Sequence, residues 1–143
     1  MLKITCTDWH TNGEWARSIR RSVFVHEQGI PEHEEWDDED ATAIHAVAWL
    51  EDEVVGTARL LTHGKIGRMA VLQHHRGKGI GAAMLAALLN EALKKGFKQV
   101  RLSAQQHAIP FYLRHGFKAD ADPHTEVGIP HQWMSKNLDV NTQ

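Results

Sequence analysis

The chain has 143 residues, enough for one domain with its own hydrophobic core and too few for two. Its formal net charge of −2 does not favour nucleic acid or an anionic membrane as the main partner, and its longest apolar stretch is far shorter than a membrane span. The single cysteine, Cys6, excludes an internal disulfide, and the N-terminus lacks the pattern of a signal peptide, so we expect a cytoplasmic protein.

The first half of the chain predicts a strand, a helix and then three antiparallel strands. Leu2–Thr7 alternates apolar and polar residues, which is typical of a half-buried strand. Thr11 and Asn12 are the predicted caps of a helix with apolar residues at three- and four-residue spacing, and Gly29-Ile30-Pro31 is expected to end it. Short turns then separate three predicted strands, at Ala43–Leu50, Val54–Leu61 and Ile66–Leu72.

Between this helix and the three strands lies an acidic segment, Glu32–Asp40, in which seven of nine residues are Asp or Glu. It is too short to be a disordered acidic tail. Because so many charges are costly to bury, we expect a solvent-exposed loop here and not part of the core.

In the second half of the chain, helices alternate with strands. Gly79–Lys95 is apolar almost all round in its first half, which predicts a helix packed deep against a sheet, with Gly96 as its C-terminal cap. A strand at Val100–Ser103, a short helix at Ala108–His115 and a final strand within Gln132–Asn137 follow. This order predicts one α/β domain over residues 1–143, built on a mixed sheet.

A glycine-rich segment, Arg76-Gly77-Lys78-Gly79-Ile80-Gly81, lies between a predicted strand and a predicted helix. Glycines let the backbone turn tightly, so that several N–H groups can point at one spot. The helix dipole adds partial positive charge there, and Arg76 and Lys78 add full charges. The segment therefore predicts a pyrophosphate-binding site.

Two of the three cofactor classes that use such a site fit poorly. A P-loop requires Ser or Thr after its lysine, whereas Lys78 is followed by Gly79. A dinucleotide fingerprint is formally matched by Gly77, Gly79 and Ala82, but it requires an acidic residue about 20 positions further on. Arg101-Leu102-Ser103 stands there instead, and three antiparallel strands precede the motif where one parallel unit is expected.

The third pattern, R/Q-x-x-G-x-G/A, fits Arg76, Gly79 and Gly81 and resembles the GNAT superfamily of N-acetyltransferases. One strand later, Ala108-x-x-Phe111-Tyr112-x-x-x-Gly116-Phe117 resembles the second block of that family, with Gln105 where Asn is usual. The N-terminal third is similar to the ElaA-like branch of the superfamily. That likeness rests on Arg20–Gln28, Gly29-Ile30-Pro31, Glu35-Trp36-Asp37 and Gly128-Ile129-Pro130-His131.

The resemblance implies an α/β GNAT acyltransferase fold, with a mixed, mostly antiparallel central sheet flanked by helices and a V-shaped splay between strands 4 and 5. Acetyl-coenzyme A would lie in the V as the acetyl donor, and no metal is expected. The fourth strand is Lys65–Leu72 by position, and its backbone would pair with the pantetheine arm. The implied cofactor-binding residues are Met69, Ala70, Val71, Arg76, Gly77, Lys78, Gly79, Ile80, Gly81, Gln105, Phe111 and Tyr112.

The implied chemistry is direct attack of a neutral amine on the thioester, without a covalent intermediate on the protein. Tyr112 is the implied catalytic residue, whose hydroxyl would donate a proton to the departing thiolate. An alkyl amine with a pKa of about 10.4 must first lose a proton, and the sequence indicates no single base. Candidates on the substrate side are Glu27, Glu35, Asp37, His45 and His131.

The acidic segment Glu32–Asp40 follows the first helix, where this fold builds acceptor specificity. It would then concentrate cationic amines, although a solvated loop without a ligand is an equal alternative. We therefore expect a small amine or polyamine-like acceptor. A coenzyme A-binding module without turnover and a protein lysine or N-terminal acetyltransferase are the alternatives, and a homodimer is a further expectation.

Overall fold

The structure is a computed structural model that describes residues 1–138. Its strands are β1 Leu2–Thr7, β2 Ile44–Leu50, β3 Glu53–Leu60, β4 Lys65–Val71, β5 Gln99–Gln105, β6 Lys118–Ala119, β7 His124–Glu126 and β8 Ile129–Asn137. Its α-helices are α1 Trp9–Arg20, α2 Glu32–Glu35, α3 Ile80–Lys94 and α4 Ile109–Arg114. A π-helical segment, η1 Arg21–Glu27, continues α1, and 3₁₀ turns cover Asp38–Thr42, Gln73–His75 and Gln106–Ala108.

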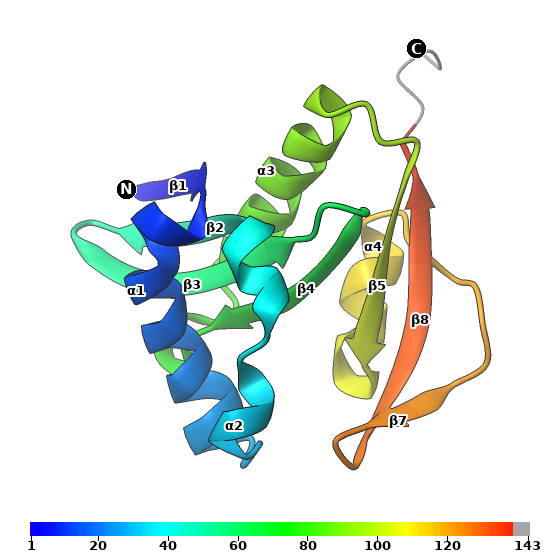
Figure 1. The fold of residues 1–143 in the computed structure, drawn as a ribbon, viewed down its shortest axis with the longest axis horizontal. Coiled ribbons are helices and arrows are strands. Elements are labelled where there is room, and N and C mark those ends of the chain that lie inside the picture. Colours follow the sequence, from blue (N-terminus) through cyan, green and yellow to red (C-terminus); the bar gives the residue numbers. More distant parts are fainter. Residues whose placement is uncertain (139–143) are drawn as a thin grey trace.

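One twisted sheet organises these elements, with the strand order β1-β2-β3-β4-β5-β8-β6 and with β7 paired to β8 (Figure 1). All neighbours are antiparallel except β4 and β5. The predicted mixed, mostly antiparallel sheet with flanking helices is confirmed. None of the helices in the described part of the chain has both the length and the apolar character needed to cross a membrane.

Helices cover both faces of the sheet, and neighbouring residues of β3 show why. Val54 packs with the cluster of α1 and η1, whereas Val55 packs with the larger cluster that contains α3, because successive strand side chains point to opposite faces. Gly56 then lets α3 approach closely. A Cβ atom there would lie 3.0 Å from the Met84 side chain and 3.1 Å from the Ala70 carbonyl oxygen.

The two central strands separate soon after they meet. β4 and β5 pair only through Lys65–Arg101 and Ile66–Leu102. Immediately beyond, the register of β4 against β3 shifts, and Arg68 adopts a φ of +49°, a left-handed conformation at the bulge. A bulge bends the bulged strand and increases its twist, so β4 turns away from β5. The predicted V between the fourth and fifth strands is confirmed (Figure 1).

Two local predictions for the first helix are wrong. Asp8 is the N-cap, since its side chain accepts a hydrogen bond from the Thr11 N–H at 2.8 Å. Asn12 lies inside the helix and is buried, where its Nδ2 donates to the carbonyl oxygens of Thr5 and His45. Asn12 therefore ties α1 to the sheet and does not cap the helix.

The acidic segment is exposed for the most part, as expected, but it forms short helical turns and two of its carboxylates are buried. Glu32–Glu35 forms α2, Asp38–Thr42 forms a 3₁₀ turn, and Glu35 and Asp40 are only 2% and 3% exposed. The expectation failed for these two carboxylates because arginines from other elements neutralise them, and sequence spacing alone did not indicate such pairing. At the other end of the chain, the final strand begins at Ile129, earlier than predicted, and pairs with the unpredicted short strand β7.

Candidate active site

The separation of β4 from β5 opens a cleft of about 830 Å³. One wall is β4 with η1, and the other is the end of β5 with α4 and the turn between β7 and β8. The predicted site residues that line it are Glu27, Glu35, Met69, Ala70, Val71, Arg76, Gly81, Gln105, Phe111, Tyr112 and His131. The cleft thus brings the predicted pantetheine and catalytic residues together with three of the five predicted acceptor residues. Its lining does not include the predicted phosphate-binding residues Gly77, Lys78, Gly79 and Ile80.

The β4 wall presents backbone that has no partner on β5. Beyond Ile66 the ladder between the two strands has ended, so Met69, Ala70 and Val71 line the cleft without pairing across it. Backbone groups in such a position can hydrogen-bond an extended ligand as an added strand would. A pantetheine arm, with its two amide groups, suits this wall.

The predicted phosphate loop, Arg76–Gly81, lies at the N-terminus of α3. Gly77 and Gly79 both have φ of +81°, which a residue with a Cβ adopts only at a cost, and Gly79 is the N-cap of the helix. Its cap has no side-chain hydrogen bond, so the first N–H groups of α3 are available to an anion. Lys78 lies beside them, with its Nζ 3.1 Å from His75 Nδ1.

The Arg76 side chain points toward Glu27 on η1. Its two Nη atoms each donate to a Glu27 carboxylate oxygen at 2.7 Å, and its Nε donates to the Val71 carbonyl oxygen at 2.9 Å. The hydrogen bonds from Arg76 hold the pKa of Glu27 below its usual range. Glu27 is therefore committed to an ion pair, which makes it a poor candidate for a base.

A contact from the end of η1 spans the cleft. Gln28 and Gln105 exchange two side-chain hydrogen bonds, at 3.1 and 2.9 Å, which connect the end of η1 to the end of β5. Gln105, which stands where the family motif usually has Asn, therefore hydrogen-bonds to the N-terminal part of the chain. Sequence patterns did not indicate this partner, which lies 77 residues away.

Tyr112 lies on α4 with its hydroxyl 3.7 Å from the Met69 sulfur, at the β4 bulge. Burial raises the pKa of Tyr112 to about 12, so the phenol keeps its proton at neutral pH. Phe111 packs edge-on against Tyr112 and also approaches Gly81, whose added Cβ would lie 3.6 Å from the Phe111 ring. The three residues connect the phosphate loop to the bulge.

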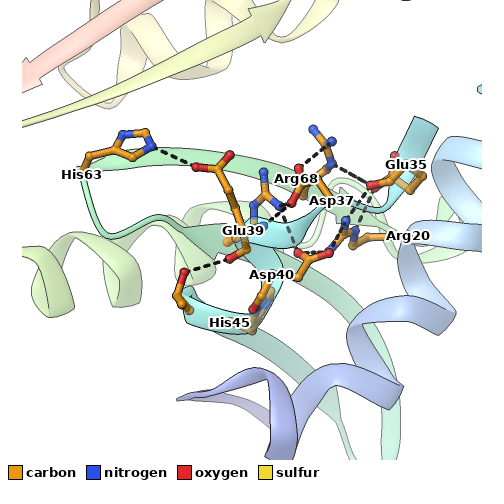
Figure 2. Close-up of polar contacts among 10 residues, drawn as sticks. Arg20, Glu35, Asp37, Glu39, Asp40, His45, His63 and Arg68 are labelled. Carbon is orange, nitrogen blue, oxygen red and sulfur yellow. Dashed lines mark hydrogen bonds and ion pairs between the residues drawn. The ribbon is translucent and has the colours of Figure 1, made fainter. Parts of the chain in front are cut away.

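Beside the bulge, three arginines and three carboxylates form a network, of which Arg20, Arg59, Glu35 and Asp40 are buried (Figure 2). Arg20 donates from Nε to Glu35 at 2.8 Å and from both Nη atoms to Asp40 at 2.8 and 3.2 Å. Arg59 donates to Asp37 and Asp40, and Arg68 pairs with Glu35 and Asp37. With equal numbers of each charge, the network is neutral, so Glu35, Asp37 and Asp40 are not free to attract amines.

The two buried carboxyls of this network titrate in opposite directions. Burial raises the pKa of Glu35, and the arginines Arg68 and Arg20 only partly oppose it. Burial acts on Asp40 as well, but hydrogen bonds from Arg20 and Arg59 outweigh it and lower the pKa of Asp40. The difference follows from geometry, because Asp40 accepts three arginine hydrogen bonds.

Two predicted substrate residues lie away from the cleft. His45 is 1% exposed, donates from Nε2 to the Asp40 carbonyl oxygen at 2.9 Å and packs against the Trp9 ring. Burial lowers the pKa of His45, so it stays neutral and structural. Asp37 is paired with Arg59 and Arg68 and does not line the cleft. His45 and Asp37 are therefore not placed to contact an acceptor in the cleft.

The opposite wall holds polar residues that the sequence did not indicate. Ser103 on β5 and Glu126 on β7 line the cleft next to His131, and His124 lies beside them. The signal that could have found them is the short H-T-E run before the Gly128 turn, which places His124 and Glu126 on one face of a strand. In the described part of the chain, no group of three or more His, Cys, Asp or Glu side chains is arranged to hold a metal.

The sequence comparisons agree with this geometry. The family model described as "Acetyltransferase (GNAT) domain" matches residues 19–138. The chain belongs to the GNAT acetyltransferase family. This GNAT protein is 35% identical over 123 residues to the "Uncharacterized N-acetyltransferase YjcF" of Bacillus subtilis, and the match covers 83% of this chain and 88% of the relative. It is 33% identical over 129 residues to "Protein ElaA" of Escherichia coli, covering 84% of each chain.

Solved structures of GNAT proteins superpose over nearly the whole chain. The crystal structure of Escherichia coli ElaA matches with a TM-score of 0.85 and 28% identity, covering 95% of this chain and 99% of ElaA. An acyl-CoA N-acyltransferase from Pseudomonas aeruginosa matches with a TM-score of 0.84 and 30% identity, covering 95% and 99% of the two chains. The predicted family and the likeness to ElaA are thereby confirmed.

Proposed function

We propose that this GNAT protein transfers the acetyl group of acetyl-coenzyme A to a small primary amine or polyamine. The observation that supports the proposal is the cleft itself. It joins the start of α3 at Gly81, a strand wall whose backbone is unpaired on the β5 side and a buried phenol in one continuous cavity. Pyrophosphate, pantetheine and thioester follow one another in the same order along coenzyme A.

In this proposal different residues of the chain bind successive parts of acetyl-coenzyme A. The N–H groups of Gly77–Gly81 and the side chain of Lys78 bind the phosphates, and Arg76 joins them when it leaves Glu27. Met69, Ala70 and Val71 hold the pantetheine arm by backbone hydrogen bonds. A backbone N–H at the bulge also stabilises the oxyanion of the tetrahedral intermediate, an effect of roughly 3 kcal/mol in comparable sites.

Tyr112 assists the leaving thiolate as a hydrogen-bond donor. With a pKa of about 12, its full deprotonation by a thiolate of pKa about 8.5 is uphill by about 5 kcal/mol, since each pKa unit is 1.36 kcal/mol. A hydrogen bond from the phenol to the developing negative charge avoids this cost. The released thiolate then takes its proton from the reacting nitrogen or from water.

The proposal is tested by calorimetry with acetyl-coenzyme A, followed by thiol release in the presence of butylamine, 1,4-diaminobutane, spermidine and tyramine. Binding followed by amine-dependent thiol release supports the proposal. Binding without release from any amine supports a coenzyme A-binding module, and release only with a lysine-containing peptide supports a protein acetyltransferase. Absence of acetyl-coenzyme A binding overturns all three.

A further inference from the structure

At the end of the cleft formed by β5, β7 and β8, four polar side chains meet. His124 Nε2 lies 2.6 Å from Glu126 Oε2 and 3.1 Å from Ser103 Oγ, and Ser103 also donates to Glu126 Oε2. The His131 ring lies 5.9 Å from the His124 ring across the β7–β8 pair. Ser103, Glu126 and His131 all line the cleft.

The two donors leave one carboxylate oxygen of Glu126 free. Ser103 and His124 both reach Oε2, and Oε1 accepts no hydrogen bond from the residues that the structure describes. Burial opposes ionisation of Glu126, but these hydrogen bonds outweigh it and lower its pKa. Glu126 is therefore an anion at neutral pH, with one oxygen available to a ligand.

Two of the other three carboxylates of the cleft are paired with arginine, and the third, Glu34, is exposed and accepts no hydrogen bond from the described residues. Glu27 is paired with Arg76, and Glu35 is paired with Arg20 and Arg68. Within residues 1–138, the only ion-pair partner of Glu126 is His124, which is charged only if protonated. Glu126 can thus pair with a ligand cation without first releasing an arginine.

His131 has a tautomer that suits it to accept a proton. Its Nδ1 lies 2.8 Å from the Ile129 carbonyl oxygen. A carbonyl oxygen only accepts, so Nδ1 must carry the hydrogen, and the neutral ring then has its lone pair on Nε2. No hydrogen bond to this Nε2 is made by the described residues.

We propose that Glu126 Oε1 binds the protonated acceptor amine and that His131 Nε2 removes its proton before it attacks the thioester. This inference rests on the proposed function and assigns the acceptor site within it. Ser103 and His124 act as positioning residues, because they fix the carboxylate by hydrogen bonds. The acceptor class is a primary amine that arrives as an ammonium ion.

The protons and electrons of the step balance. His131 takes one proton from the ammonium and passes it to water, which leaves a neutral amine. The nitrogen lone pair forms the C–N bond at the acetyl carbon, and the C–S bond breaks with its electron pair on sulfur. The second proton, lost from the nitrogen of the tetrahedral intermediate, balances protonation of the thiolate. One proton is released overall.

The binding half is tested by Glu126→Gln, with steady-state kinetics using the amine of the four-member panel that wild type acetylates fastest. We expect KM for the amine to rise about 10- to 100-fold with a much smaller change in kcat, the size of a lost charge-assisted hydrogen bond. Glu126→Asp should recover part of the loss. Glu32→Gln, which removes an exposed carboxylate paired with Arg21 outside the cleft, is the matched control and should leave KM unchanged.

The proton-transfer half is tested by His131→Gln across pH 7 to 10. We expect kcat/KM to fall about 100-fold at pH 7 and the deficit to shrink toward pH 10, where much of the amine is already neutral. The titratable groups around His131 are His124 and Glu126, and Lys65 acts on Glu126 in turn, so the variant is compared with Glu126→Gln over the same range. His10→Gln, an exposed histidine on α1, is the control.

The outcomes separate the two proposals. If wild type acetylates an amine and Glu126→Gln has the same KM for that amine, the acceptor site is overturned and the proposed enzyme function is retained. A pH-independent deficit in His131→Gln overturns its role as base. Acetyl-coenzyme A binding without wild-type turnover overturns the proposed function and the acceptor site with it. The acetyl-coenzyme A Kd of each variant, expected within about twofold of wild type, shows that the fold is retained.

Discussion

Arg68, the left-handed residue at the β4 bulge, is ion-paired through Nε with the buried Glu35 carboxylate at 3.1 Å. Glu35 lies on the four-residue helix α2, far from β4 in sequence, and also accepts from Arg20. A left-handed conformation costs a residue with a Cβ about 1–2 kcal/mol, so it persists only where the surroundings hold it. The acidic segment therefore supports the bulge that opens the cleft.

Glu35→Ala should destabilise the protein by about 3–5 kcal/mol, because it leaves Arg20 and Arg68 with a lost partner in a buried site. It should also weaken acetyl-coenzyme A binding, since the bulge loses its support. Urea unfolding followed by tryptophan fluorescence measures the first effect and calorimetry the second. Asp38→Ala, at an exposed position of the same segment outside the cleft, should stay within about 0.5 kcal/mol of wild type. Equal losses in the two variants would contradict a supporting role for Glu35.

Replacing Arg68 by Ala or by Gly separates backbone strain from charge. Both variants lose the ion pair with Glu35, but only glycine adopts a φ of +49° without a steric penalty. Arg68→Gly should therefore be more stable than Arg68→Ala by about 1 kcal/mol in urea unfolding. If Arg68→Ala were the more stable variant, the left-handed bulge would not be the conformation present in solution.

Gly79→Ala should weaken acetyl-coenzyme A binding at least tenfold, as measured by calorimetry. A Cβ at φ of +81° strains the N-cap of α3 and turns the helix N–H groups away from the phosphates. Gly96→Ala is the matched control, because Gly96 has a φ of +83°, follows the opposite end of the same helix and has open space around it. It should cost similar stability and leave acetyl-coenzyme A affinity unchanged.

Glu27→Gln should tighten acetyl-coenzyme A binding several-fold, because it releases Arg76 from its 2.7 Å ion pair toward the phosphates. The affinity of the variant should also fall more steeply with salt, since one more cation then contacts the ligand. Calorimetry at two salt concentrations measures both effects. Weaker binding in Glu27→Gln would mean that the Glu27–Arg76 pair orders the site and does not compete with the ligand.

Tyr112→Phe should lower kcat about 10- to 1000-fold while leaving the Kd for acetyl-coenzyme A nearly unchanged. The pKa of about 12 fixes the pH dependence. The phenol stays protonated as pH rises to 10 and is lost as a donor only near 12, so wild-type kcat should show no falling limb caused by Tyr112 between pH 7 and 10. Thiol-release assays of wild-type kcat across pH 7 to 10 check this pH dependence. An unchanged kcat in Tyr112→Phe would exclude a role in leaving-group assistance.

The phosphate loop, the second motif block and the order of elements could be predicted from the sequence because they depend on local rules. Gly77 and Gly79 are required wherever the backbone must turn with positive φ, and Tyr112 lies at a fixed spacing after the strand that precedes it. The spacing of apolar residues likewise predicted α3 and the three antiparallel strands β2, β3 and β4. Each of these structural features is predicted by residues that lie within a few positions of it in the sequence.

Tertiary structure alone decided what the charges do. Glu35 and Asp40 were expected in solvent, yet arginines from α1, β3 and β4 surround them, because burial of a carboxylate becomes affordable only when distant cations converge on it. The same holds for Glu126 and His131, whose hydrogen-bond partners come from the pairing of β5, β7 and β8. The sequence by itself determined the family and predicted the donor site. Contacts between distant residues decided which carboxylates are neutralised and which one is oriented by hydrogen bonds to bind an acceptor in our proposal.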